Sequence, residues 1–449
     1  MISTVLGGWG RFPLARCHVF RPERRAAVAE ILAAKSAPTF IARGLGRSYG
    51  DAALNADGGV IAHDRLDRVL AFDAGRGVLH CEAGVSIADV LRWWLPRGWF
   101  PPVTPGTKFV TLGGAIAADV HGKNHHRDGT IAMFVEALTL LTADGETVRC
   151  SRTEHADVFW ATVGGMGLTG MILDVRLRLR PVETAWLRVE HRKARDLDET
   201  LGIFASKDAD ALYSVAWIDC LARGRATGRT IMMHGDHATV AEVREAGRAP
   251  FVTPQGAAAT VPFDAPGALL NPLTVRLFNA VFYTAHRDAC RLVSVERFFY
   301  PLDAVTHWNR LYGRRGLVQY QIVLPLDEAE RGLMTLLERL SASGRPSFLA
   351  VLKRLGPEDP GLLSFPREGY TLALDLPVRD GIVEFLRDLD RIVLARGGRV
   401  YLAKDSTTTP DAVRAMYPRL DEFQAIAARL DPRGVLSSSL ARRLGLLRA

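Results

Sequence analysis

Cysteine is scarce in this 449-residue chain, and the few cysteines are far apart. Cys17, Cys81, Cys150, Cys220 and Cys290 form no CxxC pair, and their number is odd. A disulfide framework or a cysteine-based zinc site is therefore not expected, and a reducing compartment fits best.

Long apolar runs are also missing. No stretch of about 18 apolar residues occurs, so no membrane span is expected. The segment Met1 to Gly10 lacks a basic stretch followed by an apolar run, so we expect no signal peptide. The expected location is cytoplasmic, with peripheral attachment to the inner membrane face or a periplasm-facing location without a visible signal peptide as the alternatives.

The formal net charge is +8, but no run of basic residues is long enough for a nucleic-acid-binding arm. Nucleic acid is therefore not expected as a partner, whereas phosphates or an anionic membrane surface are favoured. Hydrophobic residues make up 48% and charged residues 24%, an ordinary globular composition for one to three domains.

The pattern of predicted strands, helices and turns changes near residue 183, which indicates two regions in the chain. Up to residue 183, short strands alternate with glycine-rich turns, and residues 170–179 alternate apolar and polar as in a half-buried strand. Beyond it, strands and helices follow one another in an α+β pattern. Residues 250–284 are rich in Pro, Ala and Gly and end in an apolar, aromatic tract, which predicts a long irregular, flexible loop.

The first motif, residues 42–51, reads Ala-Arg-Gly-Leu-Gly-Arg-Ser-Tyr-Gly-Asp. Glycines allow positive φ and a close approach of ligand to backbone, and successive N–H groups can form a concave site for phosphate oxygens. A tight turn between strands accounts for two of the glycines equally well. It does not account for Arg43, Arg47, Ser48 and Tyr49 in the same ten positions.

The second motif joins Pro105-Gly106-Thr107 to residues 111–117, Thr-Leu-Gly-Gly-Ala-Ile-Ala, and to residues 121–126, His-Gly-Lys-Asn-His-His. The small residues indicate that something large packs against the backbone, either a ligand or a crossing helix or strand. The histidines lack metal-ligand spacing and carboxylate partners, so no metal is expected.

Two further motifs follow. Gly165, Gly167 and Gly170 match GxGxxG, but a helix precedes them and a strand follows, the reverse of the dinucleotide-binding order. They are interpreted as a plain turn or as a close approach to a flavin. In residues 400–406, Lys404 ends an apolar strand, where it is either used by the site or paired with Asp405 at the surface.

Taken together, the motifs give the chain a family resemblance. It resembles the FAD-binding PCMH-type (vanillyl-alcohol oxidase) flavoproteins, and within them the decaprenylphosphoryl-β-D-ribose 2-oxidase group. The matching segments run from Gly8-Trp9-Gly10-Arg11 to residues 439–444 and include the first two motifs, residues 159–165, residues 317–321 and residues 403–406.

This resemblance implies an α+β fold in which a two-part PCMH-type FAD-binding domain carries an inserted α+β substrate domain. The implied boundaries are 1–183 and 399–449 for the two parts of the FAD-binding domain and 184–398 for the substrate-binding domain, with the flexible loop near 250–284.

The resemblance also implies site residues. Those expected to hold the cofactor are Arg43, Gly44, Leu45, Gly46, Arg47, Ser48, Tyr49, Gly106, Thr107, Gly113, Gly114, Ala117, Gly122, Asn124, His125, Gly167, Ile172 and Tyr401. Those expected to bind the sugar phosphate are Lys123, Arg310, Gln319, Gln321, Lys353 and Lys404. Lys404 and His121 are the candidate catalytic bases.

Two departures from the family pattern matter. Many relatives attach the flavin covalently through a histidine where this chain has Arg47, so we expect non-covalent FAD. Some members of the closer group carry a cysteine where this chain has Ala373, which puts thiol-directed inhibition in doubt but not hydride transfer.

The implied reaction is oxidation of the 2-hydroxyl of a polyprenylphosphoryl ribose to a 2-keto sugar, which a separate NAD(P)H-dependent reductase converts to the arabino epimer. The apolar tract 273–283 is either a lid that meets the polyprenyl chain, with peripheral membrane contact, or part of the core. The alternative functions are a soluble FAD-dependent sugar or alditol oxidase that uses oxygen, and a redox-inactive flavin- or lipid-binding protein.

Overall fold

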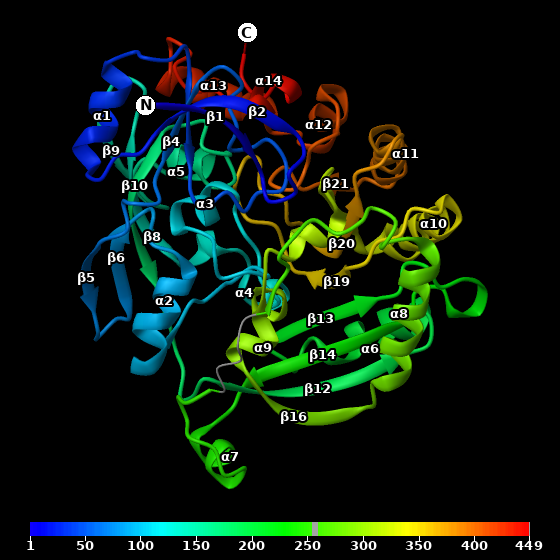
Figure 1. The fold of residues 1–449 in the computed structure, drawn as a ribbon. Coiled ribbons are helices and arrows are strands. Elements are labelled where there is room, and N and C mark those ends of the chain that lie inside the picture. Colours follow the sequence, from blue (N-terminus) through cyan, green and yellow to red (C-terminus); the bar gives the residue numbers. More distant parts are fainter. Residues whose placement is uncertain (254–258, 449) are drawn as a thin grey trace.

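The computed structural model describes residues 1–253 and 259–448. Helices and sheets are mixed along the whole chain, as expected for an α+β fold, and one large antiparallel sheet lies beside a region of smaller sheets (Figure 1). No helix in the described part of the chain is both long and apolar enough to cross a bilayer.

Two sheets form the first region. The four-stranded sheet has the order β1 (Ile2–Gly7), β2 (Leu14–Phe20), β4 (Gly59–Ala62) and β3 (Phe40–Arg43). The five-stranded sheet has the order β5 (Val69–Asp73), β6 (Val78–Glu82), β10 (Met171–Arg178), β8 (Val135–Leu141) and β9 (Thr147–Cys150). Helices α1 (Arg25–Ala33), α2 (Ile87–Trp94), α3 (Leu112–Ala117), α4 (His125–Asp128) and α5 (Ala156–Thr162) lie in the same part of the chain, as does the strand pair β7 (Trp99–Phe100) and β11 (Arg180–Pro181).

The large sheet forms the second region. Its order is β16 (Ala289–Ser294), β12 (Trp186–Ala194), β14 (Thr230–His237), β13 (Tyr213–Ile218), β19 (Ala350–Leu355), β20 (Gly369–Pro377), β18 (Leu317–Pro325) and β21 (Arg399–Val400). The helices of this region are α6 (Leu197–Lys207), α7 (Val240–Glu245), α8 (Pro272–Ala285), α9 (Val295–Phe299), α10 (Leu326–Ser343) and α11 (Ile382–Ala395), and a short pair joins β15 (Ala259–Thr260) to β17 (Val305–Thr306).

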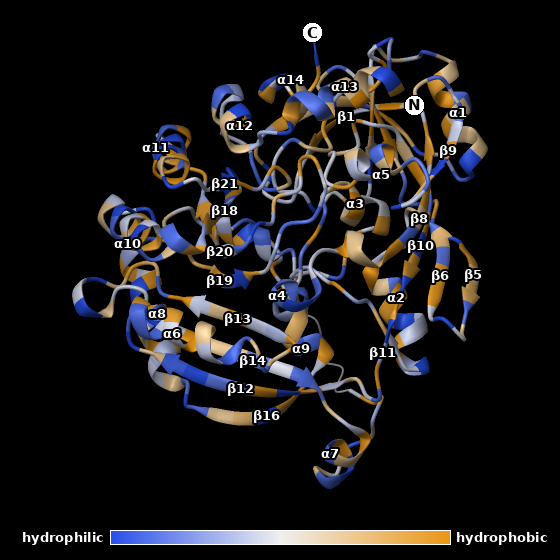
Figure 2. Ribbon diagram, turned by 180° about the vertical axis from the view of Figure 1, so that it is seen from behind, coloured by the Kyte–Doolittle hydropathy of each residue, from blue (hydrophilic) through white to orange (hydrophobic). Residues whose placement is uncertain are grey.

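The two faces of the large sheet differ in chemistry because side chains alternate along each strand. On one face, apolar residues such as Tyr320, Ile322 and Leu372 belong to the core cluster that includes the apolar sides of α10 and α11. Figure 2 shows that both helices carry hydrophilic as well as hydrophobic residues, and the buried ones among them are mostly apolar. The opposite face of β18, β19 and β20 is therefore left to carry the polar residues described below.

The C-terminal segment returns to the N-terminal region. After β21, the helices α12 (Pro410–Met416), α13 (Leu420–Leu430) and α14 (Ser439–Leu444) lie near the N-terminus (Figure 1). Leu436 forms a parallel bridge with Phe40, and Ser439 N–H donates to the carbonyl of Leu54 at 2.8 Å. Arg443 pairs with Asp51 at 2.7 Å. Strand β21, by contrast, pairs with β18 of the large sheet, and the boundaries at 183 and 398 remain predictions.

Two expectations need correction. Residues 170–179 are not a half-buried strand at their start, because β10 is the central strand of its sheet and Met171 to Val175 are all buried. Residues 250–284 are not irregular throughout, because α8 occupies Pro272–Ala285; residues 254–258 of the expected loop lie outside the described residues. The side chain of Asn271 caps α8 by accepting from the N–H groups of Leu273 and Thr274, and Pro272 suits the first helical position.

Candidate active site

A cavity of about 550 Å³ lies between the N-terminal motifs and the polar face of the large sheet. Its volume is within the range of ordinary small-molecule and cofactor sites. Its walls include the loop after β3, the segment that leads into α3, the turn between α5 and β10, and the strands β18, β19 and β20. All four sequence motifs therefore meet at one cavity.

The loop after β3 forms one end of the cavity. Gly46 has φ of +64°, a conformation that a residue with a side chain adopts at a cost. Among the described residues, no acceptor is found for the backbone N–H groups of residues 45–48. Those unpaired donors follow one another along the loop, which is the arrangement that binds phosphate oxygens. Arg43 does not take part, because its guanidinium donates to the carbonyls of Gly7 and Ala53.

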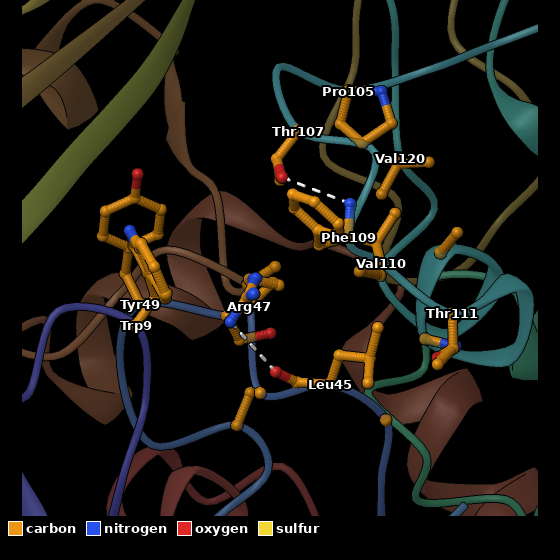
Figure 3. A pocket seen from close by; sticks show the side chains of 18 of the residues that line it. Trp9, Leu45, Arg47, Tyr49, Pro105, Thr107, Phe109, Val110, Thr111 and Val120 are labelled. Atoms are coloured by element: carbon orange, nitrogen blue, oxygen red, sulfur yellow. Dashed lines mark hydrogen bonds between the residues drawn. The ribbon is translucent and has the colours of Figure 1, made fainter. Parts of the chain in front are cut away.

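Arg47 lies inside the cavity and is held by aromatic rings. Its guanidinium lies 4.3 Å from the ring centre of Trp9 and 5.7 Å from that of Phe109. Figure 3 shows Arg47 between Trp9 and Phe109, with its side chain also reaching the carbonyl of Leu45. Burial lowers the pKa of Arg47, although Asp303 opposes that shift.

Small residues line the wall formed by α3 and the segment before it. Gly113 packs against Ala83, where an added Cβ would come within 2.8 Å of the Ala83 methyl. Gly106, which lines the cavity and is exposed, differs from Gly113 because an added Cβ would meet no protein atom within 4 Å. Gly113 therefore permits close packing within the protein, whereas Gly106 lies beside open space.

The polar wall comes from three neighbouring antiparallel strands. Gln319 of β18 is paired with Asp375 of β20, Gln321 with Ala373, and Lys353 of β19 with Thr371. Residues two apart on a strand share a face, so these side chains point to the same side of the sheet. Gln319, Gln321, Lys353 and Ala373 all line the cavity.

Lys404 lies at the same wall and has no ionic partner. Its Nζ is 4.4 Å from the ring centre of Tyr49, and within the described part of the chain it forms no ion pair or side-chain hydrogen bond. Burial lowers the pKa of Lys404 to about 8, against an opposing effect of Asp375. Asp405 does not pair with it, because Asp405 pairs with Arg443 at 2.9 Å. The interpretation of Lys404 as a surface residue paired with Asp405 is therefore wrong.

Lys353 and His121 form a second polar group on this wall. Lys353 Nζ lies 3.2 Å from His121 Nδ1, and the Gln321 side-chain amide donates to His121 Nε2 at 2.9 Å and to Thr371 at 3.1 Å. Burial and the charge of Lys404 lower the pKa of Lys353 to about 7. Burial and Lys353 lower the pKa of His121 well below its usual range. Both ring nitrogens of His121 therefore face a partner, and the imidazole is neutral.

The charge of the cavity favours an anionic occupant. Burial lowers the pKa values of Lys353 and Lys404, and the charge of Lys404 lowers that of Lys353 further. Buried cations are costly without a negative partner. A phosphate group would supply that partner. The cavity can therefore hold an elongated ligand with phosphate at the loop after β3 and a second polar group near Lys353 and Lys404.

Most of the expected site residues line this cavity. They are Arg43, Gly44, Leu45, Gly46, Arg47, Ser48, Tyr49, Gly106, Thr107, Gly113, Gly114, Ala117, His121, Gly167, Ile172, Gln319, Gln321, Lys353, Tyr401 and Lys404. The turn at Gly167 lies after α5 and before β10, the helix-then-strand order expected from the sequence.

Five expected residues do not line the cavity. They are Gly122, Lys123, Asn124, His125 and Arg310. Each polar one has another partner. Lys123 donates to the carbonyl of Phe298 and lies 4.0 Å from its ring centre. Asn124 donates to Pro102 and Asp128, and His125 accepts from the N–H of Gly356.

Arg310 is likewise engaged elsewhere, because its guanidinium donates to the carbonyls of Val261 and Pro262. Of the four cations expected to bind the sugar phosphate, Lys353 and Lys404 line the cavity, whereas Lys123 and Arg310 do not. Lys123 still affects the electrostatics, since its pKa, lowered to about 7 by burial, is also lowered by the charge of Lys353.

Sequence reasoning missed Asp375. It is 1% exposed, accepts from the Gln319 amide at 2.6 Å, and leaves its other carboxylate oxygen without a described partner. Burial raises its pKa to about 7. The signal was an aspartate inside the otherwise apolar strand 370–376, which is costly to bury unless it has a use.

Comparison with known proteins gives two family matches. The model described as an FAD binding domain matches residues 17–151, and the model described as D-arabinono-1,4-lactone oxidase matches residues 374–444. These two ranges contain the loop after β3, α3 and Lys404.

Among similar proteins, the chain is 38% identical to decaprenylphosphoryl-β-D-ribose oxidase of Mycolicibacterium smegmatis over 98% of its own length and 97% of that protein. It is 40% identical to an uncharacterized protein of Streptomyces coelicolor over 78% of its own length and 97% of the relative. It is 35% identical to L-gulonolactone oxidase of Bos taurus over 31% of each chain.

Proposed function

The chain belongs to the FAD-dependent oxidase family of decaprenylphosphoryl-β-D-ribose oxidase, and we propose that it oxidises the 2-hydroxyl of a polyprenylphosphoryl-β-D-ribose to the 2-keto sugar. It is an FAD-dependent oxidoreductase. The observation that carries the substrate proposal is the group of Gln319, Gln321, Lys353 and Lys404 on one cavity wall. Two lysines that form no ion pair with a described residue, together with two amides, suit a phosphorylated sugar.

Features of the cavity wall in this chain are suited to FAD. The unpaired N–H groups of residues 45–48 are donors for a pyrophosphate, and the open space at Gly106 leaves room for a ring system. We propose that the wall from Gly113 to Ala117 and the turn at Gly167 line the cofactor. FAD, when bound, accepts the hydride that leaves the carbon bearing the substrate hydroxyl.

We propose that the FAD is held non-covalently. Where many relatives carry the histidine that links the flavin, this chain has Arg47. The guanidinium of Arg47 lies against the ring of Trp9. His63, His121 and His307 also line the cavity, so each is a possible attachment point that a direct test must address. Acid precipitation of the purified protein is expected to leave the yellow colour in the supernatant, and colour that stays in the pellet contradicts this part of the proposal.

Lys404 is the better of the two candidate bases. A general base needs a free lone pair, and both nitrogens of His121 already face Gln321 and Lys353. Lys404 has no such partner among the described residues, and its pKa, lowered to about 8 by burial, leaves about a tenth of it as free amine at pH 7 and about half at pH 8. We assign removal of the hydroxyl proton to the Nζ atom of Lys404. We assign to His121 the role of orienting the side chain of Lys353.

The 2-keto product requires a reducing partner to become the arabino epimer. We assign that step to a separate NAD(P)H-dependent reductase. The GxGxxG glycines follow helix α5 and precede strand β10, so they lack the strand-then-helix arrangement of a dinucleotide site.

Anaerobic mixing tests the proposed substrate. Purified yellow protein is combined with farnesylphosphoryl-β-D-ribose, and the visible absorption band of the oxidised flavin is followed. Bleaching with this compound and not with free ribose supports the proposal. A protein that bleaches only with aldonolactones or free polyols is instead a sugar oxidase, the alternative favoured by the lactone-oxidase match over residues 374–444.

A further inference from the structure

Helix α8 exposes an apolar face that no described part of the chain covers. Leu273, Leu277 and Val281 are 76%, 65% and 60% exposed. They are four residues apart, so they lie one above another on a single side of the helix. Leu269, just before the helix, is also exposed. Contiguous exposed apolar residues of this kind mark an interaction surface.

The opposite side of α8 is firmly packed. Val275 and Leu270 are buried in a cluster with Tyr49, Trp308 and Leu317. Asn279 donates to Asp219 at 2.7 Å, just beyond the end of β13. The helix lies near the ends of β12 and β13 in Figure 1. Packing of the inner side therefore fixes which side of α8 faces outward. The helix is not a lid folded over the cavity.

The inner side of α8 also reaches the cavity wall. Tyr49 and Trp308 of that packed cluster line the cavity, as do Leu302 and Val305 beside them. Phe278 packs against Phe348, with ring centres 4.9 Å apart, and Leu349 next to it lines the cavity. A surface at α8 is therefore connected to the catalytic cavity by a short layer of apolar side chains.

The segment that carries the face is basic and is bounded along the chain by Asp264 and Asp288. From Ala265 to Arg287 the sequence holds no acidic residue. Arg276 lies next to Leu277 and three residues from Leu273, and Arg287 and Arg291 follow the helix; all three are exposed and form no ion pair with a described residue. Two copies facing each other here would bring like charges together, whereas an anionic lipid surface would meet complementary ones.

We propose that the exposed face of α8, formed by Leu269, Leu273, Leu277 and Val281 with Arg276 beside it, docks the enzyme on the surface of an anionic phospholipid bilayer. Apolar side chains on one side and arginines at the border are the features of helices that lie in a membrane interface. The inference rests on the proposed function in one respect, because a polyprenyl chain stays in the bilayer while its sugar phosphate enters the cavity.

Vesicle flotation tests the proposal with the intact flavoprotein. Wild-type protein is expected to float with vesicles of phosphatidylcholine and phosphatidylglycerol in equal parts, and less with phosphatidylcholine alone. The double variant L273Q/L277Q is expected to lose binding by about tenfold or more, because two leucine side chains no longer enter the interface. Leu14→Gln is the matched control, since Leu14 is 62% exposed on β2, and it is expected to bind as wild type.

Activity with a short, water-soluble prenylphosphoryl ribose separates this inference from the proposed function. The double variant is expected to bleach with that substrate as wild type does, while turnover of a long-chain substrate in vesicles falls in step with binding. Equal flotation of wild type and the double variant overturns docking through α8, whatever the substrate proves to be. A dimer in vesicle-free solution that L273Q/L277Q dissociates also overturns it, because a second copy would then cover the face.

Discussion

At the scale of single residues, the proposed reaction depends on a lysine that is uncharged for part of the time. Burial lowers the pKa of Lys404 to about 8, and no described acidic group forms an ion pair with it. A buried amine without a partner is costly to keep charged. The environment that destabilises the ammonium form therefore raises the share of free amine, which is the form that can accept a proton.

Replacement of Lys404 tests this role. Lys404→Met is expected to lower the rate of anaerobic bleaching by about 100-fold to 10,000-fold, the usual contribution of a general base, while the flavin content stays the same. Lys404→Arg is expected to be equally slow, because a guanidinium keeps the positive charge but does not accept a proton. A Lys404→Arg variant with wild-type bleaching would show that charge, not proton transfer, is what Lys404 supplies.

The pH dependence of kcat/KM follows from the same group. With Lys404 as the proposed base, the amine form is the one that removes the proton, so kcat/KM is expected to rise with pH through the pKa of Lys404, near 8. Asp375 raises that pKa through its negative charge. Asp375→Asn removes the charge and keeps the shape, so the rising limb is expected to move to lower pH. A limb that stays in place or moves to higher pH contradicts the coupling of Asp375 to Lys404.

At the scale of secondary-structure elements, the segment before α3 limits the space for the cofactor. A side chain at Gly106 would meet no protein atom within 4 Å, so Gly106→Val is expected to fold normally but to occupy space at the cavity. FAD affinity, measured by titration of the flavin-free protein, is expected to fall by about tenfold or more. Gly202→Val on α6, where a Cβ is equally free of contacts, is the control and is expected to bind FAD as wild type does.

The elements themselves could be predicted from the sequence where a single periodicity dominates. The pattern of apolar residues predicts a hairpin from strands at residues 134–141 and 147–150, and helices over residues 328–343 and 381–396. β8, β9, α10 and α11 lie close to these ranges. Helix α8 was missed because its surroundings are rich in Pro, Ala and Gly. The signal was present in the capping residue Asn271 and in the four-residue spacing of Leu273, Leu277 and Val281.

The candidate site shows a similar limit. Short glycine loops place the backbone by local rules, so the loop after β3 and the small residues of α3 reached the cavity as expected. Lys123 and Arg310 did not, because their partners, Phe298 and residues 261–262, are distant in sequence and depend on the tertiary fold. A long basic side chain can reach several places, and the sequence alone does not say which one it takes.

At the scale of the whole molecule, the end of the chain contacts the neighbour of the proposed catalytic lysine. Arg443 of α14 pairs with Asp51, near the loop after β3, at 2.7 Å and with Asp405, next to Lys404, at 2.9 Å. Both carboxylates are almost fully buried, with side chains 4% and 3% exposed, and they raise the pKa of Arg443 above its already high ordinary value. One guanidinium therefore joins the N-terminal region, the C-terminal helix and the neighbour of the proposed base.

Arg443→Met is expected to lower the free energy of unfolding by about 3–5 kcal/mol, because it leaves two buried carboxylates without their cation. Urea denaturation followed by flavin and tryptophan fluorescence measures the loss. Arg414→Met is the control, since its pair with Asp421 is exposed, and a loss of about 1 kcal/mol or less is expected there. If Arg443→Met costs no more than Arg414→Met, the C-terminal helix is held by apolar packing alone, and the ion pairs of Arg443 do not connect the two ends of the chain energetically.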